Sequence, residues 1–170
     1  MVIPPDALVL LVGAAGSGKS TVAARLFPRS AVLSSDAYRA AVSGDATDQS
    51  VTKQAFRRLH ATLERRMTAG ELAVIDATNV QAWARRRLLA VAARHGRPAV
   101  CVVLAIPLEV SLARNAARTQ GRVPSATVRL QDAFLRDSLP RLQDEGYARL
   151  VVLTDPDQVD RLTVRAGRET

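Results

Sequence analysis

Cysteine, histidine and aromatic residues are scarce in this sequence of 170 residues. Cys101 is the only cysteine and lies in an apolar run, so an internal disulfide is excluded. His60 and His95 are the only histidines, which excludes a metallophosphatase or nuclease module built on a histidine-rich metal cluster. Aromatic residues make up 4% of the chain, so few side chains are available to stack on the bases of a single strand.

Long hydrophobic runs are also missing. No segment approaches the roughly 18 consecutive apolar residues of a membrane span. The first six residues lack the basic region and apolar stretch of a signal peptide. Together with the lone cysteine, these absences predict a cytoplasmic protein without a membrane partner. The length and the 48% hydrophobic composition predict one compact domain, residues 1–170.

Lysine is nearly absent, although the formal net charge is +8. Lys19 and Lys53 are the only lysines, so 22 of the 24 basic residues are arginines. One explanation is codon bias, because a GC-rich genome favours both alanine and arginine. The other is an anionic partner such as a nucleic acid. Charge alone leaves both explanations open.

Short apolar runs alternate with helical patterns along the chain. Strands are predicted at residues 7–12, 31–33, 72–75, 98–106 and 149–153. Helices are predicted at residues 19–27, 51–69, 81–95, 108–119, 125–139 and 156–162. This alternation indicates βαβ units, so we predict the α/β class with a five-stranded parallel sheet flanked by helices. Both ends of the chain lack such patterns and are expected to be loosely held.

The clearest motif is a glycine-rich loop between the first strand and the first helix. Residues 13–21 satisfy the pattern G-x-x-x-x-G-K-[ST] of a P-loop, or Walker A motif. Its glycines let backbone N–H groups point at phosphate oxygens, and the following helix presents its positive end to the same anion. The motif predicts ATP and Mg²⁺, with Lys19 on the β- and γ-phosphates and the Ser20 hydroxyl on the metal. The predicted nucleotide-binding residues are Gly13, Gly16, Ser17, Gly18, Lys19, Ser20 and Thr21.

Two aspartates follow predicted strands. Asp36 comes after the second strand, at the sheet edge where ligands bind, and could accept the proton of an acceptor hydroxyl. Its alternative role is that of an N-cap for a helix over 37–42. Asp76 follows four apolar residues, as does the carboxylate on the Mg²⁺ side of many P-loop enzymes, and it could instead cap the turn over 77–79. The predicted metal-side residues are therefore Ser20 and Asp76.

Three arginines follow the fourth predicted strand at helical spacing. Arg114, Arg118 and Arg122 recur every four residues, which places them on one face of a helix. They could form a solvated basic face. They could also form a helical lid over about residues 114–124, hinged at Gly121 and Pro124, because guanidinium groups suit the oxygens of a transferring phosphoryl group.

Other residues are assigned structural roles. The run Arg85–Arg87 is expected on a solvated helix face, and His60 and Trp83 are expected to pack.

The sequence resembles the kinase domain of bacterial polynucleotide kinase-phosphatase, an enzyme that heals RNA ends in a repair system. Features of that kinase domain recur along essentially the whole chain. The Ser-Ser-Asp and Asp-Gln-x-Val-Thr segments point to this family more specifically than the P-loop does. The matching stretches are Gly16–Thr21, Ser34-Ser35-Asp36 with Arg39, Asp48-Gln49-Ser50-Val51-Thr52, Leu59-His60, Val74–Val80, and Arg114-Asn115 with Arg118-Thr119.

The resemblance implies an adenylate-kinase-like sheet and phosphorylation of the 5′-hydroxyl ends of RNA or DNA with ATP. Asp36 would be the general base, and Arg39 would lie near the phosphate of the acceptor. Lys19, Arg114 and Arg118 would contact the ATP phosphates, with Lys19 and Arg114 also counted as catalytic. The sequence departs from the family at Gly121, where the family can carry another lid arginine, and Arg122 is displaced by one residue. The family's phosphatase and ligase-like modules are absent here and could belong to further domains or partner proteins.

Three functions are weighed on these residues. The preferred one is a polynucleotide 5′-hydroxyl kinase. The main alternative is a small-molecule kinase that acts on a sugar acid, nucleoside or antibiotic, because similar parts serve both. The third is a nucleotide-dependent switch, which would have little use for a carboxylate aimed at an acceptor hydroxyl.

Overall fold

A computed structural model describes residues 1–45 and 50–167 of the chain. Asp48 and Gln49, part of the motif used in the resemblance, lie outside the described residues. None of the described helices is both long enough and apolar enough to cross a membrane.

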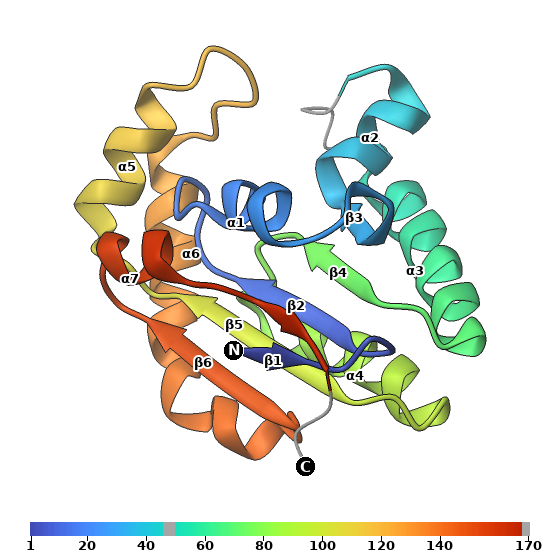
Figure 1. Ribbon diagram of the computed structural model, residues 1–170. Coiled ribbons are helices and arrows are strands. Elements are labelled where there is room, and N and C mark those ends of the chain that lie inside the picture. The colour runs from blue at the N-terminus through green and yellow to red at the C-terminus, as the bar shows by residue number, and fades with distance from the viewer. Residues whose placement is uncertain (46–49, 168–170) are drawn as a thin grey trace.

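Five parallel strands form the central sheet within the described residues (Figure 1). Their spatial order is β3-β4-β2-β5-β6. The strands are β2 (Leu8–Val12), β3 (Val32–Ser34), β4 (Ala73–Asp76), β5 (Ala99–Leu104) and β6 (Arg149–Leu153). This sheet confirms the predicted α/β class and the five predicted strands, with boundaries that differ by at most two residues.

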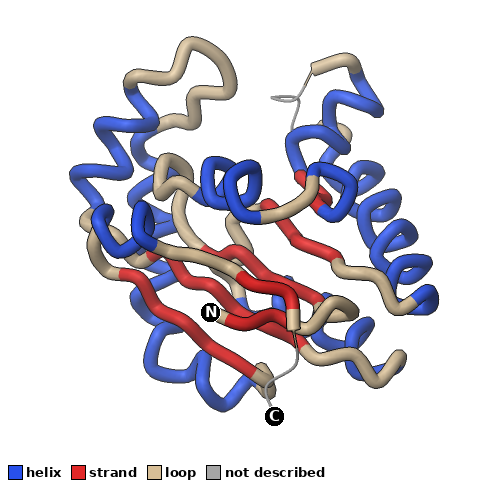
Figure 2. The backbone as a smooth tube through the Cα atoms, viewed as in Figure 1, coloured by secondary structure: helices blue, strands red, loops and turns tan. Residues whose placement is uncertain are grey.

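Helices cover both faces of the sheet (Figure 2). The helices are α1 (Lys19–Leu26), α2 (Ser35–Ser43), α3 (Thr52–Ala69), α4 (Ala82–Arg94), α5 (Leu108–Ala116), α6 (Ser125–Ser138) and α7 (Pro156–Arg161). Two 3₁₀ helices, Arg29–Ala31 and Leu139–Glu145, complete the connections; the second is called η2 below.

The strand residues alternate between two hydrophobic cores. On one face, Leu8, Leu10 and Val12 of β2 pack with residues of α3, α4 and α6. On the other, Val9 and Leu11 pack with residues of α1 and α7. All five residues of β2 are buried, which explains why the central strands are continuous apolar runs rather than alternating ones.

The two ends of the chain are joined, contrary to the expectation that they are loosely held. The short strands β1 (Val2–Ile3) and β7 (Arg165–Ala166) pair in parallel, apart from the main sheet. Ile3 is only 2% exposed and belongs to the core on the α1 and α7 face. Backbone N–H groups of Arg165 and Gly167 donate to the oxygens of Met1 and Ile3. Two residues per strand are too few to give a readable sequence pattern, so the pairing could not be predicted from the sequence.

The strand order gathers the loops of interest at one edge. The P-loop follows β2, α2 follows β3, and α5 follows β5. Asp76 at the end of β4 pairs in register with Leu11 of β2 on one side and Ser34 of β3 on the other. The carboxyl ends of parallel strands are where such sheets bind ligands, so this edge is the candidate site.

Candidate phosphotransfer site

The P-loop takes a backbone shape that requires glycine at two positions. Gly16 and Gly18 have φ of +85° and +102°, in the left-handed region that disfavours other residues. A Cβ atom on Gly16 would also lie 2.1 Å from the backbone oxygen of Ser111 in α5. The loop is therefore pressed against α5, which carries the first of the predicted lid arginines.

Lys19 is buried inside the loop. Its side chain is 8% exposed, and Nζ donates to the backbone oxygen of Ala14 at 2.7 Å and lies 3.4 Å from Ser17 Oγ. The pKa of Lys19 is lowered to about 8, chiefly by burial; the Asp76 carboxylate opposes this shift, the Arg118 charge adds to it, and the Asp36 carboxylate opposes it. The four charged groups named by the sequence pattern thus lie close enough to act on one another.

Asp76 and Ser20, the two residues predicted to hold Mg²⁺, lie next to each other. Asp76 is 8% exposed. Burial raises the pKa of Asp76, while the nearby Ser20 hydroxyl and the Lys19 charge lower it. The hydroxyl and carboxylate oxygens are hard ligands of the kind Mg²⁺ prefers and lie near each other, so they fit one small cation. No cluster of three or more His, Cys, Asp or Glu side chains suited to a metal occurs among residues 1–45 and 50–167.

Asp36 is not the N-cap residue of its helix. Helix α2 begins at Ser35 with Ser34 in the N-cap position, so Asp36 lies inside the first turn, where its charge favours the helix dipole. The Asp36 side chain is 58% exposed and forms an ion pair with Arg39, one turn along α2. Arg39, predicted near the acceptor phosphate, therefore adjoins the candidate base directly.

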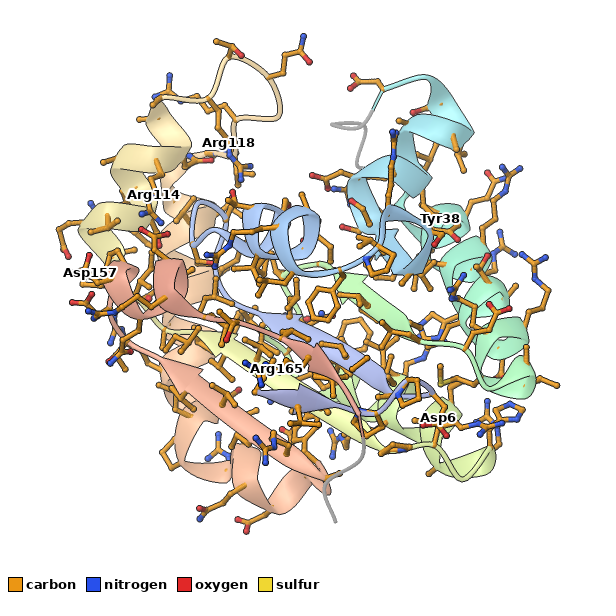
Figure 3. All side chains as sticks on the ribbon, viewed as in Figure 1. Asp6, Tyr38, Arg114, Arg118, Asp157 and Arg165 are labelled. Carbon is orange, nitrogen blue, oxygen red and sulfur yellow. The ribbon has the colours of Figure 1, made fainter. Side chains whose placement is uncertain are left out.

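The predicted lid is only partly helical. Helix α5 ends at Ala116, so Arg118 and Arg122 do not share a helix face with Arg114, and the reading of all three as one solvated helical face is wrong. Figure 3 shows Arg114 and Arg118 on the side of α5 that faces α1. Arg114 approaches Gly18 of the P-loop, whereas Arg122 lines a separate shallow pocket with Ala116 and Arg129.

Asn115 holds the end of this loop in place. Its Nδ2 donates to the backbone oxygen of Val123 at 2.7 Å, and its Oδ1 accepts from the backbone N–H of Val123 at 3.1 Å. Asn115 is 2% exposed, so this double hydrogen bond is protected from water. The segment between these residues, which carries Arg118 and Arg122, is thereby closed into a loop.

A pocket of about 930 Å³ opens beside the P-loop, between α3, α4, α6 and the turn after β4. Three of the four large hydrophobic side chains exposed in the described part of the chain, Trp83, Leu130 and Phe134, line it. Its polar lining includes the cationic side chains of Lys53, Arg57 and Arg87, as well as His60. Burial and, secondarily, the Arg87 charge lower the pKa of His60, which favours the neutral form of this ring.

Two residues that line this pocket accept hydrogen bonds from backbone N–H groups of the P-loop. The backbone N–H of Gly13 donates to the oxygen of Thr78 at 2.9 Å, and that of Ala15 donates to Gln131 Oε1 at 2.8 Å. Thr78 and Gln131 both line the pocket. A molecule held there would therefore lie next to the nucleotide loop.

Two structural assignments made from the sequence are wrong. Trp83 does not pack in the core, because it is 55% exposed at the pocket. Arg85 does not lie on a solvated face: it is fully buried, and its Nε and Nη2 donate to Glu145 at 2.8 and 2.6 Å. Arg86 and Arg87 are exposed, as expected.

Arg85 also supports the turn after β4. Its Nη1 donates to the backbone oxygen of Asn79 at 2.9 Å, and Asn79 Nδ2 donates to the oxygen of Leu11 at 2.8 Å. Asn79 has a φ of +49°, which is uncommon outside glycine. The buried pair therefore holds in place the turn that joins Asp76 to the pocket.

Sequence reasoning missed the pocket residues, although a signal exists. On α3, Lys53, Arg57 and His60 recur at helical spacing, and on α6 Thr127, Gln131 and Phe134 do the same. The α3 set is entirely polar and the α6 set mixes polar and apolar types, so neither resembles a hydrophobic face. Only the packing of α3 and α6 toward the same edge makes them one surface.

The parallel strand order, with a P-loop at the carboxyl edge of the sheet, is the α/β fold of P-loop kinases. Two carboxylates and arginines lie next to this loop. The family AAA_33, described as an AAA domain, matches residues 8–137, and the chain belongs to this family.

Solved structures agree on the fold. A candidate kinase from Chloroflexus aurantiacus has a TM-score of 0.64 at 16% identity, covering 94% of this chain and 90% of that one. AvrRxo1-ORF1:-ORF2 with ATP has a TM-score of 0.67 at 18% identity, covering 83% of this chain and 50% of that one. The Pnkp1/Rnl/Hen1 RNA repair complex has a TM-score of 0.66 at 22% identity, covering 84% of this chain and 47% of that one.

This chain spans about half the length of the last two proteins. No curated protein matches its sequence.

Proposed function

We propose that this protein is an ATP-dependent kinase that transfers the γ-phosphoryl group of ATP to the 5′-hydroxyl end of a nucleic acid. One observation carries the proposal: a pocket with both exposed aromatic and cationic side chains adjoins the P-loop through Thr78 and Gln131. Aromatic faces suit a base, and cations suit the phosphates of a strand.

The donor side follows from the P-loop. The loop amides and Lys19 would bind the phosphates of ATP, and the positive end of α1 would favour the same charges. Ser20 and Asp76 would hold Mg²⁺, which neutralises phosphate charge as transfer proceeds. Arg114 and Arg118 would close over the phosphates from the α5 side.

The acceptor side depends on Asp36. Its exposed carboxylate would accept the proton of the attacking hydroxyl and orient that hydroxyl toward the γ-phosphorus. Arg39 now pairs with Asp36, and an acceptor phosphate could compete for that guanidinium group. Lys53, Arg57 and Arg87 at the pocket would contact phosphates farther along the strand.

A small-molecule kinase remains the second candidate because of one observation. The pocket volume of about 930 Å³ falls in the range of sites that enclose small ligands, roughly 300–1,000 Å³. In that case the apolar lining would enclose the acceptor, and the basic side chains would bind an acidic group on it.

An acceptor series tests the two candidates. Initial rates would be measured with γ-labelled ATP and Mg²⁺ for a nucleoside, a nucleoside 3′-monophosphate, a 5′-hydroxyl oligonucleotide and a sugar acid, each at two salt concentrations. We expect the oligonucleotide to react fastest and the nucleoside to react very poorly. The apparent affinity for the oligonucleotide should fall as salt rises, because phosphate contacts release counterions.

A nucleoside or sugar acid that outpaces the oligonucleotide at both salt concentrations would identify a small-molecule kinase. A matched oligonucleotide that already carries a 5′-phosphate serves as the control, because it offers no acceptor hydroxyl at that end. Label on that control strand would argue against transfer to the 5′ end.

A further inference from the structure

Gln131 occupies the boundary between the P-loop and the pocket. It lies on α6, whose Val128, one turn earlier, packs in a small core with Ala14 and Ala15 of the P-loop. Its side chain accepts a hydrogen bond from the Ala15 backbone N–H, 116 residues away, at 2.8 Å. The same side chain lines the pocket. One residue of α6 thus contacts both halves of the candidate site.

The hydrogen bond to Ala15 determines how the amide group is oriented. A backbone N–H can only donate, so the carbonyl oxygen of Gln131, and not its nitrogen, must face Ala15. The NH₂ group therefore points away from the loop. Within residues 1–45 and 50–167 it has no acceptor. A donor group at this position is available to a molecule in the pocket.

We propose that Gln131 is a positioning residue that links the nucleotide loop to the acceptor. Its oxygen holds Ala15, and its NH₂ group donates a hydrogen bond to an oxygen of the acceptor. This inference rests on the proposed kinase function. It adds a contact that orients the acceptor relative to the P-loop, separate from the role of Asp36.

Two variants separate the functions of the amide. Gln131→Glu keeps an oxygen that can accept from Ala15 but removes the NH₂ donor. Gln131→Met has a similar size and removes both hydrogen bonds. Gln158→Glu is the matched control, because Gln158 Oε1 accepts from the Thr154 backbone N–H at 2.9 Å, on α7 and away from the site. Thermal unfolding would first establish that all three variants fold.

Steady-state kinetics then tests the proposal on the acceptor that the wild-type protein prefers. We expect kcat/KM for the acceptor to fall at least tenfold in both Gln131 variants, while Gln158→Glu stays at the wild-type value. The KM for ATP in Gln131→Glu should stay within about threefold, roughly the range expected when a hydrogen bond is preserved. Lowering the pH should raise the activity of Gln131→Glu relative to wild type, because a protonated carboxyl regains an O–H donor.

Several results would overturn the role of Gln131. One is a wild-type kcat/KM for the acceptor in either variant at pH 8. Another is a raised KM for ATP in both variants with the acceptor constants unchanged, since Gln131 would then serve the P-loop alone. A wild-type protein that phosphorylates a sugar acid instead would overturn only the polynucleotide assignment, and the variants would be compared on that acceptor. A wild-type protein that phosphorylates no acceptor would overturn both proposals.

Discussion

At the scale of single residues, the site is governed by charges held out of water. Lys19 is buried near Asp76, Asp36 and Arg118, and its Nζ donates a hydrogen bond to the Ala14 backbone oxygen. A buried ammonium without a full counter-charge is costly, and the phosphates of a nucleotide would supply that charge. Two predictions follow from the charges of Lys19 and Asp36.

The first prediction concerns stability and pH. Burial lowers the pKa of Lys19 from 10.5 to about 8, so between these values the unfolded chain binds more protons than the folded one. The contribution of Lys19 to the unfolding free energy should therefore rise from pH 8 to pH 10.5, by on the order of 3 kcal/mol in total. Urea unfolding of wild type and Lys19→Met at pH 7.5 and pH 10 would measure it.

The difference between the two proteins isolates Lys19, because Cys101 and Tyr147, whose pKa values burial raises, titrate in both. A constant difference across this pH range would contradict the burial of a charged Lys19. The same variant should also lose phosphoryl transfer, because the main side-chain charge on the β- and γ-phosphates is gone.

The second prediction concerns the base. Asp36→Asn keeps the shape of the side chain and removes the proton acceptor, so the transfer rate should fall about 10²–10⁴-fold. The KM for ATP should change little, because Asp36 lies outside the P-loop. Asp137→Asn is a matched control: Asp137, near the end of α6, also pairs with an arginine a few residues along the chain, Arg141 in η2, but it is not part of the site. If Asp36→Asn keeps the wild-type transfer rate, Asp36 serves only to stabilise the first turn of α2.

At the scale of elements, α5 and the loop that follows it bring arginines to the P-loop. The end of α5 at Ala116 releases Arg118 from the helical repeat, and Asn115 ties the far end of the loop at Val123. Arg118 acts on the charge of Lys19, whereas Arg122 lies in a separate pocket. The three arginines are therefore equally spaced in the sequence but lie in different surroundings in the structure.

The third prediction compares these arginines. Arg114→Ala and Arg118→Ala should each lower kcat by about 10²–10³-fold, because each would remove a charged donor to a transferring phosphoryl group. Oligonucleotide affinity should change much less. Arg122→Ala is the internal control and should have a smaller effect on kcat. Small, equal effects from all three would mean that the loop carries only solvated charges.

At the scale of the whole molecule, contacts between distant segments hold the site together. The pair Arg85–Glu145 joins α4 to η2 across 60 residues, and the paired strands β1 and β7 join the two ends of the chain. Tyr147 also donates to Glu145 at 3.0 Å, so the buried carboxylate is well satisfied. Arg85 also donates to the backbone oxygen of Asn79, so this pair helps to position the turn after β4.

The fourth prediction concerns this buried pair. Arg85→Met leaves the Glu145 carboxylate without its bidentate partner, so the unfolding free energy should fall by about 3–5 kcal/mol. The double variant Arg85→Met with Glu145→Leu should lose less, because no buried charge is left unpaired. Urea unfolding of both single variants and the double variant forms the cycle. A double variant as unstable as the sum of the single variants would contradict a direct interaction.

Much of the fold was predictable from local patterns. The three central strands, β4, β2 and β5, are buried along their whole length because both of their faces are covered, and this makes them short apolar runs. The helices follow their periodicity and breakers. The P-loop was predictable for a further reason: its glycines and lysine act through the backbone of nine adjacent residues. Asp36 and Asp76 could be assigned to the same edge, because all strands of a parallel sheet end on one side.

Three features depended on tertiary structure alone. Arg85 and Arg86 are neighbours of the same type, yet only Arg85 is buried, because the packing of α4 places it opposite Glu145. The pocket exists because α3, α4 and α6 meet at one edge of the sheet, and Gln131 reaches Ala15 only through that packing.

The physical reason is the range of the interactions. Backbone preferences and hydrophobic periods act between residues a few positions apart, and a sequence displays them directly. The Arg85–Glu145 ion pair spans 60 residues, and the hydrogen bond from the Ala15 backbone to the Gln131 side chain spans 116. Such contacts depend on which helix faces the fold brings together. The sequence by itself determined the sheet and the nucleotide loop; the tertiary structure decided which side chains surround that loop.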